Sequence, residues 1–315
     1  MNVLVYIQNN DGDISRNSLE ALALAQKLTA QTNGSVSAVS FDESLCSQLT
    51  SYQLNNIFHI NSPQLTDYDS MYFVSALERL IRDESPSLVL FGHTYEVRDW
   101  VPRLSARLDC PFISDCIEID YPNEFLFIRQ SYQGKVNVNV KSNSDCTLAS
   151  LQSGCYKIDA LTVGSTSINK IDLDLSDSKP MIVSEDKFKE ASGGVDLTRA
   201  DIILSVGRGI GKEENLQLVK DLAEKLGAEL GSSRPVVDAG WLDHSRQIGS
   251  SGQVVSPKLY FSVGVSGAIQ HQVGMKGSDN IIAINKDKNA PIFEIADYAV
   301  VGDLLEIIPK LIDNI

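Results

Sequence analysis

Two glycine- and serine-rich turns in the C-terminal half have residue types suited to binding an anionic ligand. In the first turn, Gly207, Gly209 and Gly211 surround Arg208, and the second turn is the run Gly264-Val265-Ser266-Gly267-Ala268. Each turn follows a strand-like segment and precedes a helix-like one. Backbone N–H groups at a helix start point outward with partial positive charge, and an arginine can pair with phosphate or stack on a ring. The sequence therefore predicts that phosphate groups bind at these turns.

Both turns also have other interpretations. The pattern Gly-x-Gly-x-Gly is neither a Rossmann nor a Walker motif, so the first turn could be purely structural. The second turn is similar to a hydrolase nucleophile elbow, but Ala268 stands where that motif has glycine. Acyl transfer would also need His271 or His244 to be held by a carboxylate. The alternative without a nucleophile is that Ser266 and the amides after it hold a diphosphate, and we expect no catalytic residue.

The elements around these turns follow the order of a doubly wound dinucleotide-binding fold. The strand-like DIILSV enters the first turn, and ENLQLVKDLAEKL predicts an amphipathic helix that ends at Gly227. The strand-like KLYFSV enters the second turn. Further strands and the helix-like DLLEIIPKLIDN close the chain.

The N-terminal half alternates strand-like and helix-like segments. VLVYI, SVSAVSF, IFHI and SLVLFG predict strands, and the periodicity of residues 18–32 and 68–82 predicts helices. After Pro111, short β-branched segments predict additional strand pairing. The fold class is therefore α/β, with an N-terminal parallel-sheet domain that has extra strands and a C-terminal doubly wound domain. A polar, acidic stretch over residues 165–198 places the boundary between domains 1–190 and 191–315.

Composition and charge exclude several classes of protein. The formal net charge of −14 disfavours nucleic acid as a partner. No apolar run is long enough to span a membrane, and the first residues lack the pattern of a secretion signal. The five cysteines form no C-x-x-C pair. We therefore expect reduced thiols, a cytoplasmic location and no metal site.

Several segments resemble the electron transfer flavoprotein alpha subunits. They are, in order, SRPVVDAGW, QIGSSGQVVSPKLY, GVSGAIQHQVGM, IIAINKDKNAPIF and ADYAVVGDL. The N-terminal half is similar to the family's first domain more loosely, around FGHTYEVRDWVPRLSARLDCPFISD.

The resemblance implies an extended FAD bound by the C-terminal domain. The positions that match the family's FAD-binding residues are Arg208, Ser233, Arg234, Gln247, Ile248, Gly249, Ser250, Ser251, Ser266, Gly267, Ala268, Ile269, Gln270, His271, Asn285, Asp303 and Leu304.

Physical chemistry agrees with the roles that the resemblance implies near the flavin ring. Arg234 would stabilise the negative charge gained on one-electron reduction, because an arginine does not lose its own charge. His271 could hydrogen-bond a pyrimidine carbonyl, and Ser251 could donate to N5. Taken without the resemblance, Arg234 could be a surface ion pair, Ser251 a loop hydroxyl and His271 an ordinary helix residue. Asp303 could be an N-cap, and Asn285 has a similarly structural reading.

The sequence departs from the family pattern at two places. Many members have Gly-Gln-Thr-Gly where this chain has Gly249-Ser250-Ser251-Gly252, so the hydroxyl is kept but the amide is absent. Around Gln152-Ser153-Gly154-Cys155 the family often has Arg-Pro-Gly. His59 and His93 lie outside the C-terminal motifs and are expected to be structural or surface residues.

The resemblance implies an electron carrier without substrate turnover of its own. Its partners would be a beta subunit that holds AMP, donor dehydrogenases such as the acyl-CoA dehydrogenases of fatty acid β-oxidation, and an acceptor such as a quinone oxidoreductase. One alternative is an NAD-dependent oxidoreductase, in which Glu229 at the end of the next strand would bind ribose. Another is a subunit that binds FAD only to stabilise an assembly.

Overall fold

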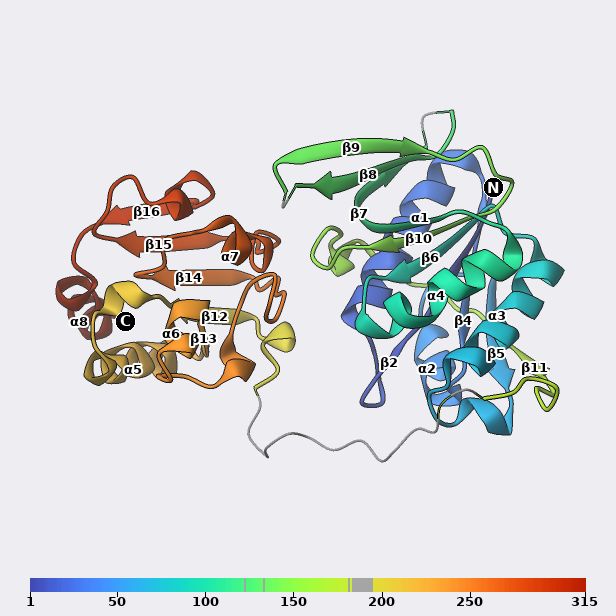
Figure 1. The fold of residues 1–315 in the computed structure, drawn as a ribbon, viewed down its shortest axis with the longest axis horizontal. Helices are drawn as coiled ribbons and strands as arrows, with labels where there is room; N and C mark the ends of the chain where they lie inside the picture. Colours follow the sequence, from blue (N-terminus) through green and yellow to red (C-terminus); the bar gives the residue numbers. More distant parts are fainter. Residues whose placement is uncertain (122, 133, 181, 183–194) are drawn as a thin grey trace. The chain divides into compact units, whose positions relative to one another are not determined.

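The structure is a computed structural model that describes residues 1–121, 123–132, 134–180, 182 and 195–315. The chain forms two compact units, Met1–Asp186 and Lys187–Ile315 (Figure 1). The boundary that we predict between residues 190 and 191 lies outside the described residues. No helix in the described part of the chain is both long and apolar enough to cross a bilayer.

The described residues of the first unit form a mixed nine-stranded sheet with the order β11-β5-β4-β1-β6-β10-β7-β8-β9. All neighbouring pairs from β11 to β7 are parallel, whereas β7, β8 and β9 pair antiparallel. The strands are β1 (Asn2–Tyr6), β4 (Ser35–Ser40), β5 (Asn56–Asn61), β6 (Leu88–Gly92), β7 (Phe112–Asp120), β8 (Leu126–Ser131), β9 (Val136–Lys141), β10 (Thr147–Leu151) and β11 (Ile168–Asp172).

Helices cover both faces of this sheet. α1 (Arg16–Thr32) and α2 (Glu43–Leu49) bury their apolar residues in the core on one face. α3 (Ser70–Glu84) and α4 (Tyr95–Leu108) do the same on the other. The smaller elements are β2 (Asn9–Asn10), β3 (Asp13–Ile14), η1 (Pro63–Leu65) and η2 (Ile158–Ala160).

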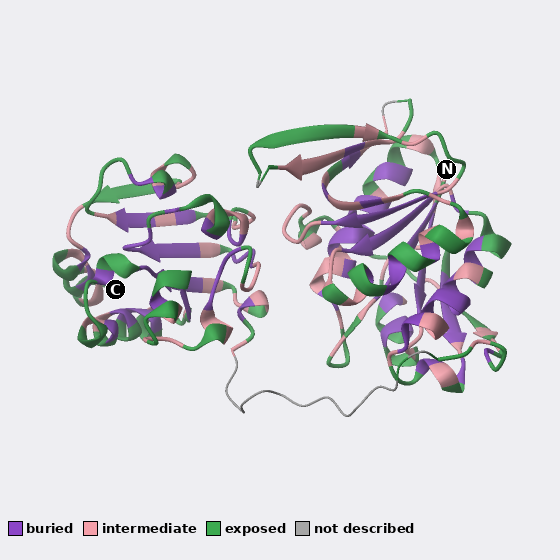
Figure 2. Cartoon of the chain, in the orientation of Figure 1, coloured by how far each residue is buried: buried purple, intermediate pink, exposed green. Residues whose placement is uncertain are grey.

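The second unit is built on an all-parallel sheet with the order β13-β12-β14-β15-β16. Its strands are β12 (Ile202–Val206), β13 (Glu229–Ser232), β14 (Leu259–Val263), β15 (Ile281–Asn285) and β16 (Tyr298–Val301). Figure 2 shows the central strands largely buried and the edge strand β16 exposed.

The two faces of the second sheet are covered differently. α5 (Leu216–Leu226), α6 (Arg234–Asp238) and α8 (Leu304–Asn314) pack on one face. The other face is covered by loop residues such as Ile248, Val255 and Met275 near the short α7 (Ile269–Val273). The remaining 3-10 segments are η3 (Leu197–Arg199), η4 (Arg208–Ile210), η5 (Glu213–Asn215), η6 (His244–Arg246) and η7 (Pro291–Glu294).

The predicted α/β fold class is confirmed, and most predicted elements are present. The helices predicted at 18–32 and 68–82 are α1 and α3, and Gly227 ends α5 in the left-handed conformation with φ +61°. α2 and α4 were not predicted from periodicity. α2 has only seven residues, and α4 contains Pro102, which interrupts a helical pattern.

Candidate functional site

The candidate site lies where the strand order of the second sheet reverses. β12 is followed in sequence by its neighbour β13, and β14 then pairs on the other side of β12. In open parallel sheets, ligands bind beyond the carboxyl ends of the strands at this type of switch point. The two glycine turns leave the sheet here, at the ends of β12 and β14.

The two turns pack together backbone to backbone. Gly209 N donates to Gly264 O at 3.0 Å, and Gly207 N donates to Val263 O at 2.9 Å. Gly264 has φ +67°, and a Cβ at this position would lie 3.0 Å from Gly209 Cα. A side chain on Gly264 would therefore strain the backbone and push the turns apart.

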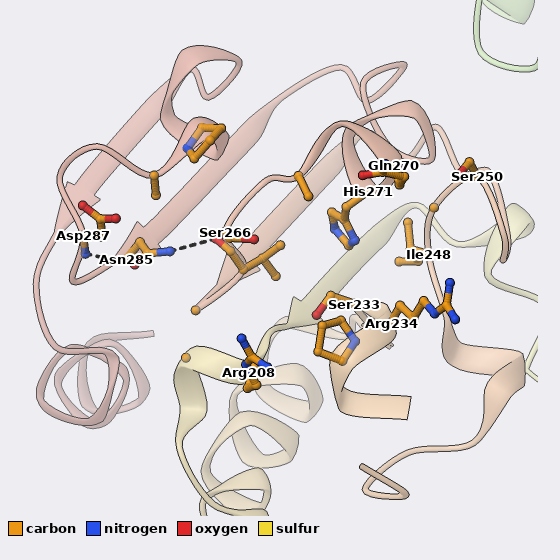
Figure 3. A pocket seen from close by; sticks show the side chains of 18 of the residues that line it. Arg208, Ser233, Arg234, Ile248, Ser250, Ser266, Gln270, His271, Asn285 and Asp287 are labelled. Atoms are coloured by element: carbon orange, nitrogen blue, oxygen red, sulfur yellow. Dashed lines mark hydrogen bonds between the residues drawn. The ribbon is translucent and has the colours of Figure 1, made fainter. Parts of the chain in front are cut away.

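A cavity of about 680 Å³ opens over these turns. This volume is typical of pockets that hold a cofactor-sized ligand. Figure 3 shows an elongated space, with Asn285 and Asp287 at one end and Arg234 and Ser250 at the other. Most of the predicted binding residues line the cavity: Arg208, Ser233, Arg234, Ile248, Gly249, Ser250, Ser251, Ser266, Ala268, Gln270, His271 and Asn285.

The backbone run Gly267–Gln270, of which Ala268 and Gln270 line the cavity, has unused hydrogen-bond donors. The backbone N–H groups of Gly267, Ala268, Ile269 and Gln270 have no acceptor within the described chain. Arg208 lines the same cavity, is exposed, and has no ion pair among the described residues. Free N–H groups next to an unpaired guanidinium suit a phosphate group.

The cavity end near Asn285 is held by a short network. Asn285 Nδ2 donates to Val265 O at 2.8 Å, and the backbone N of Asp287 donates to Asn285 Oδ1 at 3.0 Å. The side chain of Asn285 therefore ties the loop after β15 to the second glycine turn. Asp287 lines the cavity and places a carboxylate there.

The other end of the cavity carries Arg234 and the loop 249–252. Arg234 forms an exposed ion pair with Asp238, with Nε and Oδ2 3.4 Å apart. An ion pair with both side chains more than half exposed is weak, so the guanidinium can turn toward a ligand. Gln247 Nε2 donates to the backbone O and to Oγ of Ser251, both at 3.0 Å, which leaves the Ser251 proton available for another acceptor.

His271 is a buried, neutral member of the site. It is 6% exposed, and Tyr260 Oη lies 2.8 Å from its Nε2. Burial lowers the pKa of His271 to about 4, and the backbone of Ile248 offsets part of this effect. Nδ1 is buried without a hydrogen-bond partner in the described structure. The partner of Nε2 is a tyrosine and not a carboxylate, so the geometry does not support the hydrolase interpretation.

Five predicted residues do not line the cavity. Gln247 is buried and braces Ser251, and Ile269 is the first residue of α7. Gly267, at φ +80°, approaches Ile292. Asp303 caps α8 and pairs with Lys286, and Leu304 is buried beneath Gly264. Gln247, Asp303 and Leu304 therefore support the turns and loops around the cavity, whereas Gly267 and the exposed Ile269 alternate in sequence with the lining residues Ala268 and Gln270.

The placement of Glu229 was wrong. Glu229 is the first residue of β13, so it lies at the amino end of the strand, away from the cavity. Ser232 ends the strand instead. A carboxylate at the amino end cannot bind a ribose at the switch point, so Glu229 no longer supports the NAD-dependent alternative.

Sequence reasoning did not assign several lining residues to the site. They are Gly209, Pro235, Gly264, Val265, Asp287, Ala290 and Pro291. Gly209 and Gly264 belong to the two predicted turns, and Asp287, Ala290 and Pro291 lie within the quoted segment IIAINKDKNAPIF. The sequence therefore indicated the motif, but it did not indicate which residues of the loop face the cavity.

Comparison with known proteins identifies the family. A profile described as "Electron transfer flavoprotein domain" matches residues 3–176, and one described as "Electron transfer flavoprotein FAD-binding domain" matches residues 196–276. The "Electron transfer flavoprotein subunit alpha" of Bacillus subtilis (strain 168) is 37% identical over 99% of this chain and 96% of its own length. The chain belongs to the electron transfer flavoprotein alpha subunit family.

Two other relatives of this chain have different printed names. The "Electron transfer flavoprotein subunit alpha" of Thermoanaerobacterium thermosaccharolyticum is 35% identical over 99% of this chain and 97% of its own length. The "Lactate dehydrogenase (NAD(+),ferredoxin) subunit LctC" of Acetobacterium woodii is 32% identical over 99% of this chain and 76% of its own length. As a member of this family, the chain binds FAD and serves in electron transfer. Membership does not favour the NAD-dependent alternative.

The cavity fits the cofactor of the family. An extended dinucleotide needs a long space, donors for a diphosphate near its middle, and polar groups at both ends. The cavity supplies free N–H groups, the guanidinium of Arg208 and the unpartnered Nδ1 of His271. These groups would lose hydrogen bonds without a ligand, so their arrangement suits a bound FAD.

Proposed function

We propose that this chain holds FAD in the cavity over the two glycine turns and, with a beta subunit, carries electrons from dehydrogenases to a downstream acceptor. The observation that carries this proposal is the row of unpaired N–H groups from Gly267 to Gln270 beside Arg208, at the switch point of the sheet. These donors bind a diphosphate at the centre of the cavity.

When bound, FAD supplies a ring that accepts and releases electrons one at a time. The residues of the chain orient this ring and set the charge around it. Arg234 places a permanent positive charge at one end of the cavity. Ser251, braced by Gln247, offers a hydroxyl proton, and His271 offers Nδ1.

At the opposite end, the chain holds the adenosine half. Asn285 keeps the loop after β15 against the second glycine turn, and the Asp287 carboxylate can accept hydrogen bonds from ribose hydroxyls. Asp303 and Leu304 stabilise this end without lining the cavity, because Asp303 pairs with Lys286 and Leu304 packs against Gly264. The carrier itself then needs no catalytic side chain.

The partners are part of the proposal, and they come from the sequence resemblance and from the names of two relatives. The Bacillus relative is named as a subunit alpha, which supports a heterodimer with a beta subunit, and that subunit would hold AMP. Acyl-CoA dehydrogenases are the proposed donors and a quinone oxidoreductase the proposed acceptor. The name of the Acetobacterium relative makes a lactate dehydrogenase complex a second candidate setting. The five free cysteines support a cytoplasmic location.

Purification together with the beta subunit tests the proposal. We expect a yellow complex with one FAD per alpha chain, and bleaching of the flavin absorbance when a reduced acyl-CoA dehydrogenase is added. Bleaching by a lactate dehydrogenase instead would change the proposed donor but would still support the proposed role as an electron carrier. A colourless complex that oxidises NADH with a small substrate would contradict the proposal. A yellow complex that exchanges no electrons with any dehydrogenase would leave the FAD only an assembly role.

A further inference from the structure

A polar group sits inside the otherwise apolar layer beneath the cavity. The layer includes Ile203, Tyr260, Ile281 and Ala283, and the Tyr260 side chain is fully buried on the central strand β14. A buried tyrosine hydroxyl needs a hydrogen-bond partner, and its partner here is His271. The sheet therefore places a hydroxyl directly behind a histidine that lines the cavity.

The two nitrogens of His271 have different surroundings. Nε2 lies 2.8 Å from Tyr260 Oη, whereas Nδ1 is buried and has no partner in the described structure. The rings meet edge to face, at an angle of 61° with their centroids 6.1 Å apart, so an edge contact accompanies the hydrogen bond. When one nitrogen of a histidine is fixed by a partner, the state of the other nitrogen is fixed as well.

The chemistry of the pair favours one direction for this bond. Burial lowers the pKa of His271 to about 4, and burial also raises the pKa of Tyr260, so both groups are neutral at pH 7. A neutral phenol is a good donor, and an imidazole nitrogen without a proton is a good acceptor. These properties favour donation from Tyr260 to Nε2, which would leave the single imidazole proton on Nδ1.

We propose that Tyr260 is a positioning residue that fixes His271 as the tautomer with a proton on Nδ1, and so presents one N–H donor to a carbonyl oxygen of the flavin ring. This inference rests on the proposed function, because the acceptor is the FAD of that proposal. Tyr260 itself lies behind His271 and acts through it.

The tautomer can be measured directly. The chain contains only four histidines, so a histidine-labelled sample gives a tractable ¹⁵N spectrum. We expect the FAD-loaded full chain to show His271 as the Nδ1–H tautomer. In Tyr260→Phe, we expect a mixture of tautomers, a more negative potential for the first electron, and FAD affinity reduced by less than about tenfold.

Tyr156→Phe is the matched control. Tyr156 Oη accepts from the backbone N of Ile119 in the first unit, so its loss should leave the His271 tautomer and the flavin potential unchanged. His271 as the Nε2–H tautomer in the wild type would overturn the inference, and this measurement needs no variant. An unchanged tautomer in a folded Tyr260→Phe variant would overturn it too. Absence of FAD from the wild-type protein would instead count against the proposed function, while the tautomer can still be determined.

Discussion

Both sheets of the chain have a switch point, but the groups around the two switch points are bonded differently. In the first sheet, the order reverses between β1 and β6, and in the second between β12 and β14. The second switch point is bordered by glycine turns whose N–H groups are free. At the first, polar side chains and backbone groups bond to one another.

The contacts at the first switch point come from several elements. Thr94 Oγ1 donates to Gln8 Oε1 at 2.7 Å, and the backbone N of Gln8 donates to Ser18 Oγ at 3.0 Å. Asn17 packs so closely on Gly92 that a Cβ there would lie 2.5 Å from the Asn17 Cβ. Several N–H groups and side chains at this edge therefore bond to one another, and Asn17 fills the space over Gly92.

The largest expected effect comes from adding one methyl group at each switch point. Gly264→Ala forces a side chain into a left-handed position and against Gly209, so we expect FAD affinity to fall about 100-fold, or about 3 kcal/mol. Gly92→Ala should lower thermal stability through its contact with Asn17, yet leave FAD content unchanged. Absorbance titration with FAD and thermal unfolding of both variants measure the two effects. Equal loss of FAD in the two variants would contradict the claim that only the second switch point binds FAD.

The second prediction uses titratable groups near the two edges that respond to pH in opposite directions. Burial raises the pKa of Glu20 to about 7, and Gly154 N–H and Arg16 offset part of this effect. The folded state then holds a proton that the unfolded state loses near pH 4.5, so stability falls as pH rises from 4.5 to 7. For His271, with its folded pKa of about 4, stability falls instead as pH drops from 6.5 to 4.

Glu20→Gln removes the first of these responses. We expect the difference in unfolding free energy between Glu20→Gln and wild type to increase by about 3 kcal/mol in favour of the variant from pH 4.5 to 8. Urea unfolding at several pH values measures it, and the difference cancels the contributions of the other groups. A difference that does not change with pH would show that burial does not raise the pKa of Glu20 in the folded protein.

The smallest expected effect concerns the arginines at the two edges. Arg16 pairs with the buried Glu20, whereas Arg234 pairs with the exposed Asp238. Arg234→Ala should reduce FAD affinity by less than about tenfold, but bring the two one-electron reduction potentials of the bound FAD closer together. Reductive titration measures the separation. Arg16→Ala is the control and should leave the potentials unchanged, and unchanged potentials in Arg234→Ala would remove the role given to that residue.

Much of the fold could be predicted because its long elements have clear periodicity. α1, α3 and α5 present apolar residues at helical spacing, and the strands of both sheets are short apolar runs between polar turns. α4 was missed because Pro102 obscures its pattern, and α2 because it is short. Local pattern therefore predicted elements better than it predicted their bounds.

The candidate site could be predicted as a set of segments but not as a set of facing side chains. The glycine turns and Arg208 line the cavity because their strands end there. Gln247, although in the same motif, turns inward to brace Ser251, and Asp287 faces the cavity from a loop whose position depends on Asn285. These orientations are set by tertiary hydrogen bonds, which the sequence pattern does not contain.

The structure of the FAD-loaded protein is the most direct test of the account. Crystals of the complex grown with excess FAD should show the diphosphate at the N–H groups of Gly267 to Gln270, and the flavin ring near Arg234, Ser251 and His271. A cavity that is empty or filled by packed side chains, or FAD at the edge formed by β1 and β6, would contradict it.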